Sequence, residues 1–328
     1  MNNKNVFITG GAGYVGCELT NFLLNEGYTV TVLDLMIYGE NVFINHDSLN
    51  IIKGDIRDEQ LLKKIIPNHN ILIHLACISN DPSFEMNPTL GKSINYNAFE
   101  PLVNISRKSG VERFIYASSS SVYGIKSELN VHEDMILEPL TDYSKYKAEC
   151  EIILNKYKSE DFTPVTIRPA TVCGYSPRQR LDVVVNILTN LAYHNRRISI
   201  FGGKQLRPNI HIEDMVRAYE ILIKSPSNKI SGEIFNAGYE NCSVLELANI
   251  VKNIIGEDVK LDSKPTNDNR SYHISSKKIK KILGFETIKT ISDAVNDLRS
   301  AFEKGLLPNS LTDEKYFNIK RMNSIQLK

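Results

Sequence analysis

Short apolar runs rich in β-branched residues alternate with longer amphipathic segments through the first 170 residues of the chain. The short runs have the length of strands, and the longer segments repeat apolar residues at helical spacing. Strands are predicted at 6–9, 29–34, 50–55, 71–76, 113–118 and 164–169, and helices at 14–25, 58–64, 95–109 and 143–158. This alternation predicts βαβ units and an α/β fold whose doubly wound parallel sheet is covered on both faces.

The alternation weakens beyond residue 170. The stretch "RPATVCGYSPRQRLD" (168–182) is predicted as a loop, followed by helices at 181–193, 211–224, 244–255 and 291–303 and a strand at 233–238. We interpret residues 1–170 together with about 209–240 as one domain that shares the first sheet. Residues of about 171–208 and 241–303 form a smaller α+β lobe, and 304–328 form a loosely held polar tail.

Composition excludes several classes of protein. The net charge of +1 gives no electrostatic reason to expect nucleic acid or an anionic membrane as a partner. No apolar run approaches the roughly 18–20 residues of a membrane span, and the first residues lead straight into a strand, which leaves no room for a signal peptide. The five cysteines are widely spaced without a C-x-x-C pair, which favours reduced thiols in the cytoplasm. No cluster has metal-ligand spacing.

The segment "ITGGAGYVG" (8–16) joins the first strand to the first helix. Gly10, Gly13 and Gly16 permit a tight turn and a close approach of the backbone to a pyrophosphate at the helix N-terminus. Asp34 ends the second strand 21 positions after Gly13, which suits a carboxylate that binds the adenosine ribose. These features predict a Rossmann domain. Because Asp34 repels a 2′-phosphate and "DLMIYGEN" (34–41) offers no basic residue, NAD is favoured over NADP.

Tyr143 and Lys147 lie four positions apart in "TDYSKYKAECE" (141–151), on one face of a predicted helix. A tyrosine with an ordinary pKa near 10 becomes a proton acceptor near neutrality only if a cation such as a lysine ammonium lowers its pKa. Four serines, 118–121, follow the fifth strand in "SSSSVYG", where a parallel sheet presents ligand-binding groups. A serine at this place can hold a substrate hydroxyl while the tyrosine removes its proton.

Further motifs complete a resemblance to a known family. They are "GDIRD" (54–58), "HLAC" (74–77), "RPATVCG" (168–174), "LRPNIHIEDM" (206–215) and "DNRSYHIS" (268–275). Over about residues 1–300 the chain resembles the extended short-chain dehydrogenases/reductases of the NAD-dependent nucleotide-sugar epimerase/dehydratase family. The resemblance implies that Ser119 is the catalytic hydroxyl, acting with Tyr143 and Lys147, and that the other three serines are strand-end or loop groups.

The resemblance also implies contacts with NAD along the glycine turn and the neighbouring strand ends. Asp55 and Ile56 are expected to flank the adenine, although a helix cap is an alternative role for Asp55. Besides the glycines, Asp34 and Lys147, the implied cofactor residues are Tyr14, Val15, Asp55, Ile56, Leu75, Ala76 and Cys77, with Asn95 helping to fix the active-site helix.

A nucleotide-sugar substrate is implied in the second lobe. Arg207 and Arg270 are expected to clamp its diphosphate, because guanidinium groups match phosphate oxygens. Asn186 is assigned to the same diphosphate. Arg178 and Arg180 are assigned to the base, phosphate or sugar, with a solvated loop as the alternative. The remaining expected substrate residues are Ser119 and Thr171, whereas His74 and His211 are expected to be structural.

The residues beside Ser119 limit the reaction. The family's 4,6-dehydratases carry an Asp-Glu pair directly after the catalytic hydroxyl, where this chain has Ser120 and Ser121, and the cysteine and histidine of the 3,5-epimerases are also missing. A C4 dehydrogenase or a C4 epimerase remains. The nearest subgroup is the GDP-manno-heptose 4-dehydrogenases of bacterial capsule polysaccharide pathways, and a non-catalytic NAD sensor or scaffold is a further alternative. Family resemblance also implies a homodimer through helices 95–109 and 143–158.

Overall fold

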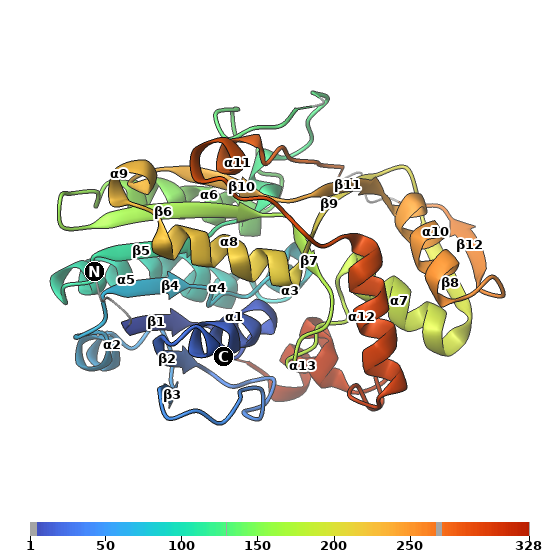
Figure 1. Cartoon of the computed structure of the whole chain (residues 1–328), viewed down its shortest axis with the longest axis horizontal. Helices are drawn as coiled ribbons and strands as arrows, with labels where there is room; N and C mark the ends of the chain where they lie inside the picture. The colour runs from blue at the N-terminus through green and yellow to red at the C-terminus, as the bar shows by residue number, and fades with distance from the viewer. Residues whose placement is uncertain (1–4, 129, 267–270, 328) are drawn as a thin grey trace.

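The structure is a computed structural model that describes residues 5–128, 130–266 and 271–327. A seven-stranded parallel sheet in the order β10-β6-β5-β4-β1-β2-β3 forms the centre of the larger part (Figure 1). The predicted α/β Rossmann architecture is confirmed. The strands are β1 (Asn5–Thr9), β2 (Thr29–Asp34), β3 (Leu49–Lys53), β4 (Ile71–His74), β5 (Arg113–Ala117), β6 (Thr163–Pro169) and β10 (Ile234–Ala237).

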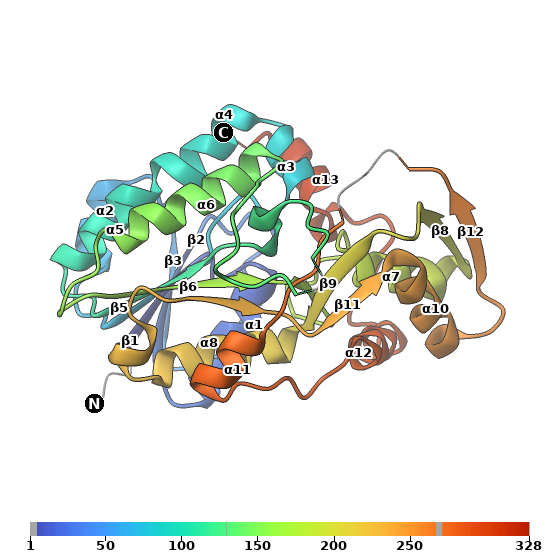
Figure 2. The ribbon, with the colours of Figure 1, turned by 90° about the horizontal axis from the view of Figure 1, so that it is seen from above.

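Helices cover both faces of this sheet (Figure 2). One apolar core lies under α1 (Tyr14–Asn25), α8 (Ile212–Lys224) and α11 (Lys277–Leu283). A second core lies on the opposite face under α2 (Glu59–Ile65), the π-helical turn Ser93–Asn97, α5 (Phe99–Lys108) and α6 (Asp142–Asn155). Short helices α3 (Asp81–Glu85), α4 (Pro88–Lys92) and α9 (Ser227–Ile230) and a 3-10 turn at Ser120–Tyr123 connect these elements. The central strands are therefore buried on both sides, which is why they appear in the sequence as continuous apolar runs.

The smaller part contains two short sheets. One has the order β11-β9-β7, and the other pairs β12 with β8. Helices α7, α10 and α12 form a separate apolar core with them. The bounds are β7 (Thr171–Cys173), β8 (Arg197–Phe201), β9 (Leu206–His211), β11 (Glu240–Ser243), β12 (Lys260–Lys264), α7 (Val184–Asn195), α10 (Val244–Ile255), α12 (Ile291–Glu303) and α13 (Asn318–Ile325), with a 3-10 turn at Glu314–Tyr316.

Short strands account for most differences from the prediction. The predicted loop 168–182 contains β7, and β8, β9, β11 and β12 were not predicted at all. Each of these strands has at most six residues and carries exposed or partly exposed positions, so none shows a continuous apolar run. By contrast, β10 pairs with β6 at the edge of the large sheet, so the chain returns to that sheet within 209–240 as we expected.

The prediction of a loosely held tail at 304–328 is wrong for the residues that the structure describes. Tyr316, Asn318 and Met322 are at most 6% exposed. The backbone N–H of Leu181 donates to the carbonyl of Tyr316, and Arg321 donates to the carbonyl of Ile37. The polar composition misled the sequence interpretation, because some of these polar groups form hydrogen bonds with the body of the protein.

Candidate active site

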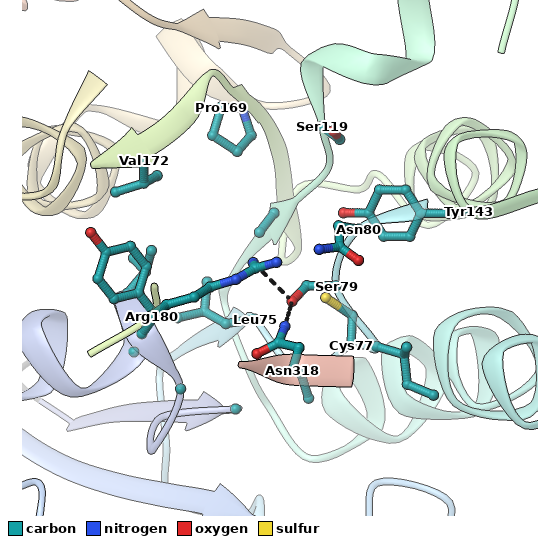
Figure 3. Close-up of a pocket in the computed structure, with 18 of the residues that line it drawn as sticks. Leu75, Cys77, Ser79, Asn80, Ser119, Tyr143, Pro169, Val172, Arg180 and Asn318 are labelled. Carbon is teal, nitrogen blue, oxygen red and sulfur yellow. Dashed lines mark hydrogen bonds between the residues drawn. The ribbon is translucent and has the colours of Figure 1, made fainter. Parts of the chain in front are cut away.

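A cavity of about 470 Å³ lies at the carboxyl ends of the central strands. Its wall combines Gly10 after β1, Asp34 at the end of β2, Leu75 after β4, Ala117 at the end of β5 and Pro169 at the end of β6. Parallel strands that end at one edge of a sheet bring these groups together although they are far apart in the sequence. Figure 3 shows that Ser119, Tyr143 and Arg180 face this same space.

The glycine turn fits a dinucleotide for steric reasons. Gly10 has φ +75°, and a Cβ there would lie 2.5 Å from the backbone nitrogen of Ala76. A Cβ at Gly16 would lie 2.3 Å from the carbonyl oxygen of Gly10, so only glycine allows α1 to approach the turn this closely. The N-cap of α1 is Gly13, which provides no side-chain cap. The first N–H groups of α1 are therefore free to bind phosphate oxygens.

The carboxylate of Asp34 is fixed by the backbone beside this turn. It accepts hydrogen bonds from the backbone N–H groups of Ala12 (3.0 Å) and Met36 (2.8 Å). Burial raises the pKa of Asp34, while these bonds and the charge of Arg178 oppose the increase. The position at the end of β2 is that of a ribose-binding carboxylate, and the residues present fit NAD.

All but one of the other expected cofactor residues line the cavity. They are Tyr14, Val15, Asp55, Ile56, Leu75, Ala76 and Cys77. The alternative role of Asp55 as a helix cap is wrong, because Asp58 caps α2 by accepting from Gln60 and Leu61.

Asn95 does not line the cavity. Its side chain accepts from the N–H of Ile78 (2.8 Å) and donates to the carbonyl of Ile78 (2.9 Å), and its carbonyl accepts from the thiol of Cys150 on α6. Asn95 thus supports the wall from behind and is bonded to the active-site helix.

Ser119, Tyr143 and Lys147 all line the cavity. Ser119 follows β5, and its Oγ accepts from the N–H of Ser121 and lies 2.9 Å from the Ser121 hydroxyl. The Lys147 ammonium donates to the carbonyl of Ala117 (2.7 Å) and lies 5.9 Å from the centre of the Tyr143 ring. The three side chains predicted from widely separated motifs therefore meet in one place.

The electrostatics of Tyr143 differ from the prediction. Burial raises the pKa of Tyr143 well above its ordinary value, and nearby Cys77 and Asp81 raise it further. Arg180 and a hydrogen bond from Ser119 lower the pKa but do not offset burial. The protein chain by itself thus favours the neutral phenol. The lowered pKa that we inferred from the Lys147 spacing did not take burial into account.

Sequence reasoning missed the support at the N-terminus of α6. Thr141 caps this helix in a capping box with Ser144, and its hydroxyl donates to the buried carboxylate of Asp81 (2.5 Å). Asp81 also lines the cavity. The capping pattern "TDYS" was a visible signal for Thr141, whereas only the fold brings Asp81 beside it.

Ser118 explains part of the serine run. Its hydroxyl donates to the Glu151 carboxylate (2.5 Å), which also accepts two bonds from the Arg168 guanidinium at 2.9 and 2.6 Å. Ser118, Glu151 and Arg168 are each at most 5% exposed. The hydroxyl of Ser118 thus anchors the end of β5 to α6 and β6, and the following residue, Ser119, lines the cavity.

The expected substrate residues are only partly gathered at the cavity. Thr171, Arg178, Arg180 and Arg207 line it, whereas Arg270 lies outside the described residues. Asn186 does not line the wall: its side chain accepts from the N–H of Gly174 and donates to the hydroxyl of Tyr14 and the carbonyl of Arg180. Asn186 therefore joins α7 to the glycine-turn helix, and the assignment of its side chain to the diphosphate is wrong.

Arg178 is buried, and the side chain of Arg180 is only 11% exposed. Arg178 stacks on the ring of Tyr38 at 3.6 Å, four positions after Asp34, so it lies on the adenosine side of the cavity. Arg180 pairs with Asp182 at 2.5 Å and donates to Ser79. Arg207 lies 5.3 Å from the ring centre of Tyr272. The alternative of a solvated loop for 178 and 180 is wrong.

His211, Glu213 and Asp297 bring three possible metal ligands within 4.8 Å of one another. Both ring nitrogens of His211 are engaged, since Nδ1 accepts from the N–H of Glu213 and Nε2 lies 3.0 Å from Asp297. Lys289 already pairs with Glu213 at 3.2 Å. The cluster therefore caps α8 and joins it to α12.

Among the helices in the described part of the chain, none is long and apolar enough to cross a membrane.

The fold and the site define a dinucleotide-binding enzyme with a Ser-Tyr-Lys set. The chain belongs to the NAD dependent epimerase/dehydratase family, whose sequence model matches residues 6–238. NAD is its cofactor.

Three proteins illustrate the similarity. A dTDP-D-glucose 4,6-dehydratase from Bos taurus is 29% identical and aligns over 84% of this chain and 82% of its own. The crystal structure of a UDP-glucose 4-epimerase with UDP-glucose from Thermotoga maritima is 26% identical, with a TM-score of 0.84 over 92% of this chain and 99% of its own. The structure of MoeE5 in complex with UDP-glucuronic acid and NAD is 25% identical, with a TM-score of 0.80 over 92% and 99%.

Proposed function

We propose that this enzyme oxidises the C4 hydroxyl of a nucleotide-activated sugar. The observation that carries the proposal is that Ser119, Tyr143 and Lys147 line the same cavity as the glycine turn and Asp34. A hydroxyl held by Ser119 and Tyr143 is thereby next to the place where the dinucleotide fits. The similar UDP-glucose 4-epimerase and MoeE5 bind UDP-sugars, which supports a nucleotide sugar as the substrate class.

Each residue has one task in this reaction. Ser119 holds the substrate hydroxyl, and Tyr143 as phenolate takes its proton, so that the C–O–H group becomes a ketone. NAD⁺, held by the glycine turn and Asp34, would supply the acceptor for the hydride from the same carbon, and its positive charge would favour the phenolate. Lys147 adds a second positive charge 5.9 Å from the centre of the Tyr143 ring. Burial raises the pKa of Tyr143, which Arg180 and the hydrogen bond from Ser119 oppose, and the charges of Lys147 and the cofactor would act in the same direction as Arg180.

Dehydration is disfavoured by the side chains next to Ser119. Ser120 and Ser121 are hydroxyls, and the Ser121 hydroxyl is bonded to Ser119. Asp81 does bring a carboxylate to the cavity, but this carboxylate accepts the hydroxyl of Thr141. The site therefore supports hydride transfer at one carbon more directly than elimination of water.

We propose a net 4-dehydrogenase reaction, with GDP-manno-heptose as the substrate that the sequence resemblance suggests and a bacterial surface polysaccharide as its destination. A 4-epimerase is the second candidate, favoured by the similarity to the UDP-glucose 4-epimerase. A dehydrogenase releases the 4-ketone and leaves NADH, whereas an epimerase returns the hydride to the opposite face and leaves the cofactor oxidised.

Incubation of the purified enzyme with UDP- and GDP-sugars tests the proposal. Formation of NADH with a 4-keto product in equal amounts is expected for the dehydrogenase. A C4-inverted sugar without net NADH would support the epimerase instead. Solvent deuterium at C3 or C5 of the product, or loss of water from C5 and C6, would contradict chemistry confined to C4.

A further inference from the structure

The C-terminal segment 313–327 forms part of the wall of the NAD cavity. Asn318, Met322 and Leu327 line the cavity, and Asn318 and Met322 are 3% and 6% exposed. The match to the family's sequence model ends at residue 238, well before this segment. The cavity wall is thus completed by residues outside the matched region.

Three loops around the cavity are tied to this segment. Arg321 donates to the carbonyl of Ile37, three positions after Asp34. The backbone N–H of Asn318 donates to the carboxylate of Asp182 (2.7 Å). The side-chain amide of Asn318 donates to Ser79 after β4 (3.2 Å), and Figure 3 shows Ser79 between Asn318 and Arg180. The segment therefore bridges the loops that follow β2, β4 and β7.

Arg178 connects the C-terminal segment to the adenosine side of the cavity. Its Nη2 donates to the side-chain oxygen of Asn318 (2.8 Å), and its ring partner is Tyr38. Its Nε is buried without a hydrogen-bond partner among the described residues, and so is Nη2 of Arg180. Burial lowers the pKa of Arg178, so the protein does not compensate its charge fully. Two buried N–H donors without a hydrogen-bond partner among the described residues, one of them on a guanidinium whose charge is not fully compensated, match an anionic dinucleotide.

We propose that the segment 313–327 is a clasp that closes the NAD site, with Asn318 aiming Arg178 at the dinucleotide and Arg321 holding the clasp on the loop after β2. The clasp slows the release of NAD from the cavity. This inference concerns cofactor binding alone and holds for either net reaction.

The release rate of NAD tests the clasp directly. Protein loaded with radiolabelled NAD is mixed with excess unlabelled NAD, and the remaining bound label is followed over time. Asn318→Ala and Arg321→Ala are each expected to release label about tenfold faster, because each removes a hydrogen bond that involves a charged group. Asn323→Ala is the matched control, since Asn323 is an exposed asparagine on the same helix.

Hydrogen exchange provides a second readout that does not depend on the variants. Addition of NAD to wild-type protein is expected to slow amide exchange in 313–327 and in 36–38 together. Release rates equal to wild type in both variants would overturn the proposal, and so would exchange in 313–327 that is indifferent to NAD. If a variant failed to fold, the exchange result on the wild-type protein would decide. A normal release rate with altered sugar turnover would overturn the clasp and assign these residues to substrate binding, while the proposed reaction would be tested separately by its products.

Discussion

At the scale of single residues, the four serines after β5 have separate environments. Ser118 bonds to the buried Glu151–Arg168 pair, Ser119 faces the cavity, and Ser121 bonds to Ser119. Ser120 is buried at the start of the 3-10 turn. All four serines line the cavity, but their hydroxyls have different partners: that of Ser118 is taken by the Glu151 carboxylate, whereas those of Ser119 and Ser121 lie next to each other.

Replacement of Tyr143 by phenylalanine tests the proposed base. Tyr143→Phe is expected to lower kcat roughly 10²–10⁴-fold, because general base catalysis is lost, while NAD remains bound. Tyr146→Phe is the matched control: Tyr146 lies on the same helix but contacts Phe84 and Tyr96 rather than the cavity. Steady-state kinetics with the identified sugar nucleotide measure both. Equal turnover in wild type and Tyr143→Phe would assign the base elsewhere.

His74 makes stability depend on pH. Its ring is buried at the end of β4 with Nδ1 2.7 Å from the Thr9 hydroxyl, and burial, aided by Lys147, lowers its pKa to about 3. The unfolded chain binds a proton on this imidazole below about pH 6.5, whereas the folded chain does not. The free energy of unfolding therefore falls as pH decreases from about 6.5 towards 3, by about 2 kcal/mol at pH 5 from this group.

Thermal melting at pH 7.5 and pH 5 measures this effect. His74→Gln is expected to show a smaller loss of Tm between the two values than wild type, because glutamine does not titrate. His132→Gln, a change at an exposed histidine, serves as the control and is expected to retain the wild-type dependence. An unchanged pH dependence in His74→Gln would show that other groups dominate acid destabilisation.

At the scale of elements, α6 organises the site. Tyr143, Lys147 and Glu151 are four residues apart on one face of the helix. Tyr143 and Lys147 reach the cavity, while Glu151 binds Ser118 and Arg168. The helix N-terminus is tied to Asp81 through Thr141. Because α6 is fixed at both ends of this face, the relative position of phenol, ammonium and Ser119 is set by the fold.

Glu151→Gln tests this anchoring. The change leaves the buried Arg168 guanidinium without its counter-charge, so a loss of about 3 kcal/mol in the free energy of unfolding is expected. Urea denaturation measures the loss. Glu59→Gln, which breaks the exposed pair with Lys63, is expected to change stability by less than about 1 kcal/mol. A similarly small effect of Glu151→Gln would mean that the pair does not hold α6 in place.

At the scale of the whole molecule, the C-terminal residues return to the first half of the chain, where Asn318 bonds to Ser79 and Arg321 bonds to Ile37. Asn318 also bonds to Arg178 in the loop after β7. The cavity is thus enclosed by both ends of the sequence, which is consistent with a cofactor held through catalysis.

A homodimer through α5 and α6 is the remaining prediction at this scale. Both helices lie on one face of the sheet, and Ile152 on α6 is 62% exposed. Ile152→Glu is expected to convert the dimer to a monomer, as measured by sedimentation or light scattering, because a charge would have to be buried. Ile288→Glu, at an isoleucine that is 67% exposed elsewhere, is the control. A monomeric wild-type protein would contradict the prediction.

Local sequence patterns were enough to predict the central sheet, the glycine turn, Asp34 and the pair Tyr143 and Lys147. Each of these depends on a strand end, a helix start or a spacing of four positions, which a few neighbouring residues encode. Helices 244–255 and 291–303 were predicted with their observed bounds for the same reason. The short strands of the smaller part were missed, since pairing with distant partners, rather than local pattern, makes them strands.

The sequence by itself determined the Rossmann architecture and the cofactor, and it singled out Ser119, Tyr143 and Lys147, which the structure brings to one cavity. Only the tertiary structure decided that the side chains of Asn95 and Asn186 bond to other groups of the protein, that Arg178 stacks on Tyr38, and that the C-terminal segment lines the cavity. Burial also reversed the expected direction of the Tyr143 pKa. The physical reason is the same in each case. Desolvation and long-range hydrogen bonds depend on which groups the fold brings together, and the spacing of residues within a short segment does not predict these contacts.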